Sequence, residues 1–193
     1  MEALIELLHR QPSDERILLS AIGLCEKNRT YPELLVALSD DRIAFDLSSK
    51  AFLRALGACL EWTDVTEWPI SRIETVLVSN LPRWGTLVRK DSLADLLRVV
   101  HVMVSRGLGV LSVHSESLPL KMHVDDFRTE LLRVLWYSST VSTLFTILKT
   151  SLDGDNIVNI LLGHNSEDDR NMQSVMEAQE VSLTCLSSLF HLV

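Results

Sequence analysis

Aromatic residues, glycine and proline are scarce in this sequence. Only 6% of its 193 residues are Phe, Trp or Tyr, and it contains seven Gly and five Pro. All-β sandwiches and barrels join many short strands through turns rich in Gly and Pro, so this composition excludes such folds. Hydrophobic residues at 47% and charged residues at 23% are ordinary globular values, and they exclude wholesale disorder.

The sequence also lacks a long hydrophobic run. The longest charge-free stretch near the middle, residues 134–148, has 15 residues, of which six are Ser or Thr. A membrane-spanning helix needs about 20 predominantly apolar residues. Residues 1–8 contain two acids and no basic residue, which argues against a signal peptide. We therefore expect no membrane partner and an intracellular location, cytoplasmic or nuclear.

Cysteine is rare, and nothing in its placement indicates a disulfide framework. Cys25, Cys59 and Cys185 are far apart, and each lies in an apolar helical context. Free cysteine is among the most buried residue types, and a reducing compartment keeps it as a thiol. These three residues are therefore predicted to be buried free thiols.

Motifs that would indicate catalysis or a bound group are missing as well. No G-x-S-x-G nucleophile elbow occurs, and no cysteine has the surroundings of a reactive thiolate. His101, His114 and His123 contain no pair at the i, i+4 spacing of a helical zinc site. The sequence predicts no metal, no cofactor and no enzymatic activity.

Positive charge is sparse. The sequence contains 18 Lys and Arg and 26 Asp and Glu, which gives a net charge of −8. Phosphate-binding surfaces need clustered Lys and Arg. The densest basic stretch holds only Arg83, Arg89 and Lys90, with Asp91 next to it. Nucleic acid is therefore not the expected partner, and a basic patch formed by these three residues is the third hypothesis for function.

Helical periodicity is the strongest pattern that is present. Thr30–Glu33 has the composition of a helix start, with a capping Thr, an early Pro and Glu three residues on. The strongest predicted helix, 93–106, is apolar on most sides, and Gly107 suits its C-terminal cap. Apolar spacing predicts further helices over 43–62, 73–78, from Asp125, 141–148, 157–162 and 172–192. About nine or ten helices without a sheet predict an all-α fold.

A weak internal repeat indicates a more specific architecture. Ser49–Leu56 is echoed by Ser92–Val99 at a spacing of 43 residues, and residues 51–60 align again with 181–190. A short apolar helix, an acidic turn and a longer helix with small residues resemble an armadillo or HEAT repeat, whose length is about 40–47 residues. The resemblance implies a right-handed superhelix of stacked helix pairs, with about four repeats in one domain over 1–193, as part of a longer solenoid or alone. An irregular multi-helix bundle is the alternative.

The resemblance implies a non-enzymatic protein–protein interaction scaffold or adaptor that binds a partner peptide or helix. The acidic balance favours a basic or amphipathic partner segment. Trp and Arg are favoured interface anchors, and the last helix stays apolar to its end. The candidate partner-binding residues are Trp62, Trp68, Arg72, Arg83, Trp84, Leu183, Leu186, Leu189 and Phe190. The alternative for each is a place in the protein's own core.

A second hypothesis is an all-α enzyme or small-ligand carrier with an interhelical pocket near His101. This residue lies between Val100 and Val102 on the apolar helix 93–106. A deep pocket around its side chain, together with a perturbed pKa, would favour this hypothesis, and a solid core there would remove it.

Overall fold

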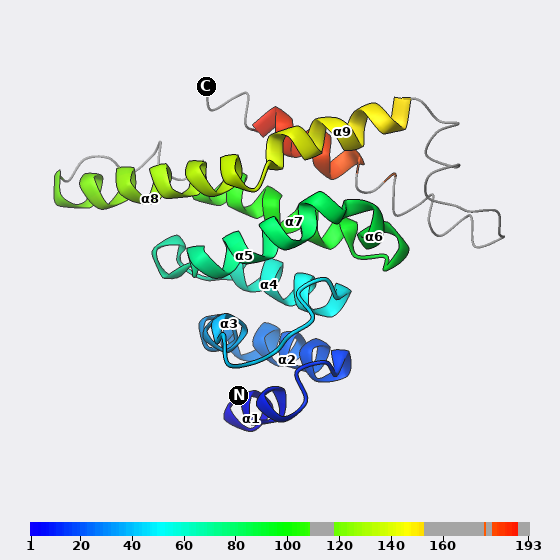
Figure 1. The fold of residues 1–193 in the computed structure, drawn as a ribbon. Coiled ribbons are helices and arrows are strands. Elements are labelled where there is room, and N and C mark those ends of the chain that lie inside the picture. The colour runs from blue at the N-terminus through cyan, green and yellow to red at the C-terminus, as the bar shows by residue number, and fades with distance from the viewer. Residues whose placement is uncertain (109–117, 153–175, 177–178, 189–193) are drawn as a thin grey trace.

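The computed structural model describes residues 1–108, 118–152, 176 and 179–188 (Figure 1). Within these residues the protein has nine α-helices and no strand, which confirms the predicted all-α class. The helices are α1 (Glu2–Arg10), α2 (Glu15–Asn28), α3 (Tyr31–Ser39), α4 (Lys50–Trp62), α5 (Ile70–Asn80), α6 (Trp84–Arg89), α7 (Leu93–Val102), α8 (Leu118–Tyr137) and α9 (Thr140–Leu152). Two 3₁₀ turns, η1 (Val65–Glu67) and η2 (Leu81–Arg83), and a π-helical segment, η3 (Met103–Leu108), lie between them, and residues 179–188 are helical.

The helices stack in chain order, from α1 at one end to α8 and α9 at the other (Figure 1). Helix α4 lies in the middle of the stack and packs against both α2 and α7. Helices α4 and α7 run in the same direction, because their paired residues rise together in number. Lys50 pairs with Asp91, and Arg54 Nε lies 3.5 Å from Asp95 Oδ1.

Helix α2 runs in the same direction as α4. The two helices pack side by side, and their C-terminal ends lie together. Tyr31, just after α2, stacks on Trp62, the last residue of α4, with ring centroids 6.2 Å apart. Helices α2, α4 and α7 therefore form one row of parallel helices.

Arginine side chains join neighbouring layers at helix ends, where backbone carbonyls lack helical partners. Arg106 Nη1 donates to the carbonyl oxygens of Leu60, at 2.7 Å, and Thr63, at 3.2 Å, at the end of α4. Arg72 Nε donates to the Leu38 carbonyl near the end of α3, at 3.1 Å. These contacts fix each helix against the end of an earlier one.

The predicted helix over 43–62 is too long at its start, since α4 begins at Lys50. Ser49 is extended at the N-cap, and its hydroxyl accepts a hydrogen bond from the Phe52 backbone N–H. Before it, the Asp46 carboxylate accepts from the backbone N–H and the hydroxyl of Ser48, which stabilises a turn. Helical apolar spacing in 43–49 thus comes from side chains that enter the core from a loop.

The prediction of Gly107 as a C-terminal cap is wrong. Helix α7 ends at Val102, and the chain continues as the π-helical η3, which contains Gly107. No described glycine has positive φ. A Cβ on Gly107 would lie 2.5 Å from Leu131 Cδ1 and 3.0 Å from Trp68 Cζ3. Glycine is needed here because α8 and Trp68 approach the backbone closely.

Four other predicted helices differ in their bounds from the structure or lie wholly or partly outside the described residues. The helix predicted over 73–78 extends over Ile70–Asn80, and that predicted from Asp125 begins at Leu118. The segment 157–162 and the parts of 172–192 other than 176 and 179–188 lie outside the described residues.

No single helix within the described residues is long and apolar enough to cross a membrane. The segments Thr129–Tyr137 and Thr140–Leu148, which meet at 53°, together reach the necessary length and apolar composition.

Candidate functional site

An open groove of about 670 Å³ runs between α1 and α3 and reaches the segment that follows α4. We call it the α1–α3 groove. Its apolar lining consists chiefly of Ile5, Pro32, Leu35, Val36 and Pro69. Val36 is 72% exposed in the middle of α3, although its helix neighbours Leu35 and Ala37 are buried. The groove therefore presents an accessible apolar surface on a rigid helix.

Acidic groups dominate the polar lining of the α1–α3 groove. Glu33, Asp40 and Glu67 contribute carboxylates, against one guanidinium from Arg42. Arg42 is already engaged, because its Nη2 donates to Asp40 Oδ2 at 2.7 Å. Hydrogen bonds from Arg42 hold the pKa of Asp40 well below its usual range. Glu33 and Glu67 thus leave the groove with an excess of negative charge.

One buried hydroxyl in the α1–α3 groove has no partner. Thr63 lines the groove, is nearly fully buried, and its Oγ1 makes no hydrogen bond. A buried hydroxyl without a partner costs free energy. Trp62, 67% exposed, directly precedes Thr63, and its ring partner Tyr31 directly precedes Pro32. The exposed Trp62, stacked on the buried Tyr31, therefore borders the groove.

A smaller pocket of about 380 Å³ lies between α4 and α7. We call it the α4–α7 pocket. Its lining includes His101, as the second hypothesis requires, together with Arg54, Glu61, Asp95 and Arg98. Burial raises the pKa of the Asp95 carboxyl, although the nearby guanidinium groups of Arg54 and Arg98 act to lower it. The region around His101 is thus hollow and polar rather than a solid core.

Two of the predicted anchors, Trp68 and Arg72, lie inside the molecule, with 5% and 9% of their surface exposed. Trp68 packs edge-on against Phe127, with ring centroids 6.2 Å apart. The Arg72 guanidinium lies 5.8 Å from the ring centroid of Phe52 and pairs with Asp41 at 3.1 Å. Both side chains therefore join helices of this chain.

The other anchors predicted between residues 62 and 84 are more accessible. Trp62 and Arg83 are exposed, and Trp84 is half-buried against the core. Neither Arg83 nor Trp84 lines the α1–α3 groove or the α4–α7 pocket. The structure thus brings only Trp62, of this set, next to a groove.

The predicted anchors of the last helix are divided between the core and the surface. Leu186 is buried, and its neighbour Cys185 has its Sγ 3.8 Å from the Leu97 carbonyl oxygen of α7. Leu183 is exposed. Leu189 and Phe190 lie outside the described residues. Residues 179–188 thus pack on α7 through one face.

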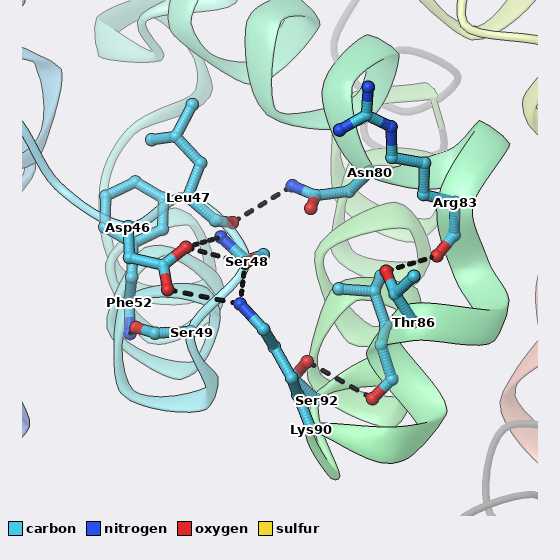
Figure 2. A network of polar contacts seen from close by, with 11 residues as sticks. Asp46, Leu47, Ser48, Ser49, Phe52, Asn80, Arg83, Thr86, Lys90 and Ser92 are labelled. Carbon is cyan, nitrogen blue, oxygen red and sulfur yellow. Dashed lines mark hydrogen bonds and ion pairs between the residues drawn. The ribbon is translucent and has the colours of Figure 1, made fainter.

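The three residues of the proposed basic patch do not act as free charges together. Lys90 Nζ donates to Ser48 Oγ at 2.6 Å and pairs with Asp46 at 3.3 Å (Figure 2). Arg83 and Arg89 are exposed. The acidic turn before α4 therefore neutralises one of the three cations.

Val36 was missed by the sequence-based prediction, although a signal for it exists. Residues 34–38 are five consecutive apolar residues, which is more than one turn of helix. Because all sides of such a helix are apolar, one side remains exposed unless neighbours surround it. Trp136, 83% exposed on α8, was likewise absent from the predicted anchors.

The three cysteines take no part in either site. Cys25, Cys59 and Cys185 are buried free thiols, as predicted. Burial raises the pKa of each thiol, that of Cys185 to about 12. Among the residues that the structure describes, no group of three or more His, Cys, Asp or Glu side chains is placed to hold a metal ion.

Comparisons with known proteins give no relative for this chain. No protein-family model, curated protein or solved structure matches it.

Proposed function

We propose that this protein is a non-enzymatic interaction scaffold, and that a basic amphipathic segment of a partner protein binds in the α1–α3 groove. The observation that carries the proposal is the exposed Val36 at the centre of an apolar groove whose polar lining is acidic. An amphipathic helix binds such a surface by its apolar face, while its charged face meets the edges of the groove.

The charge of the groove favours a basic segment over an acidic one. Glu33 and Glu67 make no ion pair with another described residue, whereas Arg42 is held by Asp40. A basic side chain at the edge would find an unpaired carboxylate, and an acidic one would be repelled. The net charge of −8 acts in the same direction over longer distances.

The architecture that we propose behind this function is an armadillo- or HEAT-like stack. Three features support it. Helices α2, α4 and α7 form one parallel row, as equivalent helices of successive repeats do. Helices α4 and α7 begin after Ser49 and Ser92, the positions that the 43-residue sequence spacing relates. Arginines of later elements contact the ends of α3 and α4.

A photo-crosslinking experiment tests the proposed function. A photoreactive amino acid replaces Val36 in one variant and Leu19 in another, because Leu19 is a 47% exposed apolar residue of α2 outside the groove. We expect the Val36 variant to capture a partner peptide that contains Lys or Arg beside apolar residues, and the Leu19 variant not to capture it.

The captured partner is then purified and titrated against wild-type protein and Val36→Lys. We expect the substitution to weaken binding by about tenfold or more, or about 1.4 kcal/mol, since a central apolar contact is lost and a like charge is added. Equal crosslinking from both positions, or unchanged affinity of Val36→Lys, would contradict the proposal.

A further inference from the structure

The α4–α7 pocket carries charges of both signs, and their arrangement indicates a ligand of its own. The pocket lies between two helices that run in the same direction, so their residues face one another in order. Arg54 faces Asp95 at one end, at 3.5 Å, and Glu61 and His101 follow along their helices toward the other end. Leu53, Gly57, Ala58 and Val102 complete the lining with apolar or small groups.

The end of the pocket at Asp95 has an excess of positive charge. Asp95 is only 5% exposed, and its sole ion pair among the described residues is with Arg54. Arg98, exposed and one turn further along α7, also acts on the Asp95 carboxyl. Two guanidinium groups therefore lie near one carboxylate, but only Arg54 forms an ion pair with it. Arg98 has no ion pair with another described residue. A ligand carboxylate would pair with Arg98 at this end.

The other end of the pocket presents a negative charge. Glu61 is exposed and has no salt bridge with another described side chain. His101 lines this end as well, but its Nδ1 is enclosed by the protein and does not face the pocket. A ligand ammonium would therefore pair with Glu61.

We propose that the α4–α7 pocket binds a small zwitterion, with its carboxylate at Arg98 and Arg54 and its ammonium at Glu61. Arg54 and Glu61 are seven residues apart on α4, so their backbones are about 10.5 Å apart along the axis, which suits an ω-amino acid. A simple anion would meet Asp95 and Glu61, and a simple cation would meet both arginines. This site is separate from the α1–α3 groove and does not depend on its function.

Calorimetric titration of the full chain tests the proposal with defined probes. Glycine, β-alanine and γ-aminobutyrate present ammonium and carboxylate at increasing separation, while butyrate and n-butylamine each present one group. We expect saturable binding for at least one zwitterion, with butyrate and n-butylamine weaker by about tenfold or more. We also expect the imidazole NMR signals of His101 to shift during the same titration.

Substitutions assign the binding to this pocket. Arg98→Gln and Glu61→Gln change exposed side chains, so both variants keep the fold, which circular dichroism verifies. Each should lower the affinity by about tenfold. Arg89→Gln, which removes an exposed cation of α6 outside the pocket, should leave it unchanged. Absence of saturation with all three zwitterions, equal binding of butyrate, or unaltered affinity in both pocket variants would overturn the proposal.

Discussion

Arg72 places a charged side chain inside the molecule where α3 and α5 meet. Its Nε donates to the Leu38 carbonyl oxygen at 3.1 Å, and its guanidinium lies 5.8 Å from the ring centroid of Phe52. The salt bridge to Asp41 contributes less to stability, because Asp41 is largely exposed and solvent screens the pair. The hydrogen bond and the packing of the arginine stem therefore carry most of its contribution to stability.

We predict that Arg72→Ala lowers the free energy of unfolding by about 1–3 kcal/mol, because a carbonyl oxygen loses its donor and packed methylene groups are removed. Urea denaturation followed by circular dichroism measures the change. Arg42→Ala is the matched control, since Arg42 is an exposed arginine that also pairs with an aspartate, and its loss should change stability by less than about 0.5 kcal/mol. Equal effects of the two substitutions would contradict this account of Arg72.

The buried carboxyl of Asp95 predicts a pH dependence of stability. Burial raises its pKa in the folded protein above the unfolded value, so the folded state retains this proton to higher pH than the unfolded state. Stability contributed by this group is therefore lost as the pH rises through the folded pKa.

We predict that Asp95→Asn stabilises the protein at neutral pH, and that this gain disappears when the pH is lowered below both pKa values. Unfolding midpoints of wild type and variant, measured in parallel from acid to neutral pH, show the trend. A variant that is less stable than wild type at neutral pH would indicate that the ion pair with Arg54 outweighs burial.

At the scale of elements, the junction of η3 with α8 depends on the missing side chain of Gly107. An added Cβ would lie 2.5 Å from Leu131 Cδ1 and 3.0 Å from the Trp68 ring, and both residues are buried. The buried Leu131 side chain and the Trp68 ring would have to shift to make room. Gly23, in the interior of α2, has no such neighbour within 4 Å.

We predict opposite effects for the same substitution at these two glycines. Gly107→Ala should destabilise the protein by about 1–3 kcal/mol through overpacking. Gly23→Ala should stabilise it by about 0.5–1 kcal/mol, because alanine is the better helix former. Thermal and urea denaturation of both variants test the difference, and a stabilising Gly107→Ala would contradict the close packing of η3 on α8.

The helices were predictable from the sequence to different degrees, for identifiable reasons. Helix α3 was found because Pro32 and Glu33 mark its start in the sequence itself, but the prediction of a capping Thr30 side chain was wrong, since its hydroxyl donates to Cys25 Sγ instead. The start of α4 was misplaced because Ile43 and Phe45 are buried from a loop, which their apolar spacing cannot distinguish from a helix. The π-helical η3 was missed, and the close contact of its Gly107 with Leu131 and Trp68 comes from residues distant in sequence, which no local pattern reports.

The candidate sites were less predictable than the fold. Trp62 was named as an anchor and is exposed beside the α1–α3 groove, but Trp68 and Arg72, chosen by the same reasoning, are buried. Residue type favours an interface role for all three, yet only the packing of the connecting segment decides which of them faces solvent. The hollow beside His101 depends on small residues of α4 that no local motif relates to α7.

At the scale of the whole molecule, the stacked helices leave open surface between them. Helices α1 and α3, which line the groove, lie at the N-terminal end of the stack, and α4 and α7, which line the pocket, lie further along it (Figure 1). The groove lies between α1 and α3 and the pocket between α4 and α7, and in each case the stacking of the fold brings the two helices together. Binding of a partner in the groove would therefore depend on the relative positions of the stacked helices as well as on the apolar and acidic side chains.

The most direct test of this account is the titration of one defined peptide into three proteins. The peptide is an amphipathic helix of about 18 residues with leucine on one face and lysine on the other. The proteins are wild type, Val36→Lys in the groove and Leu19→Lys on α2, which make the same change at two exposed apolar positions. We predict saturable binding to wild type and Leu19→Lys, and binding at least about tenfold weaker to Val36→Lys. Equal affinity for all three proteins, or no binding to wild type, would contradict a partner-binding groove between α1 and α3.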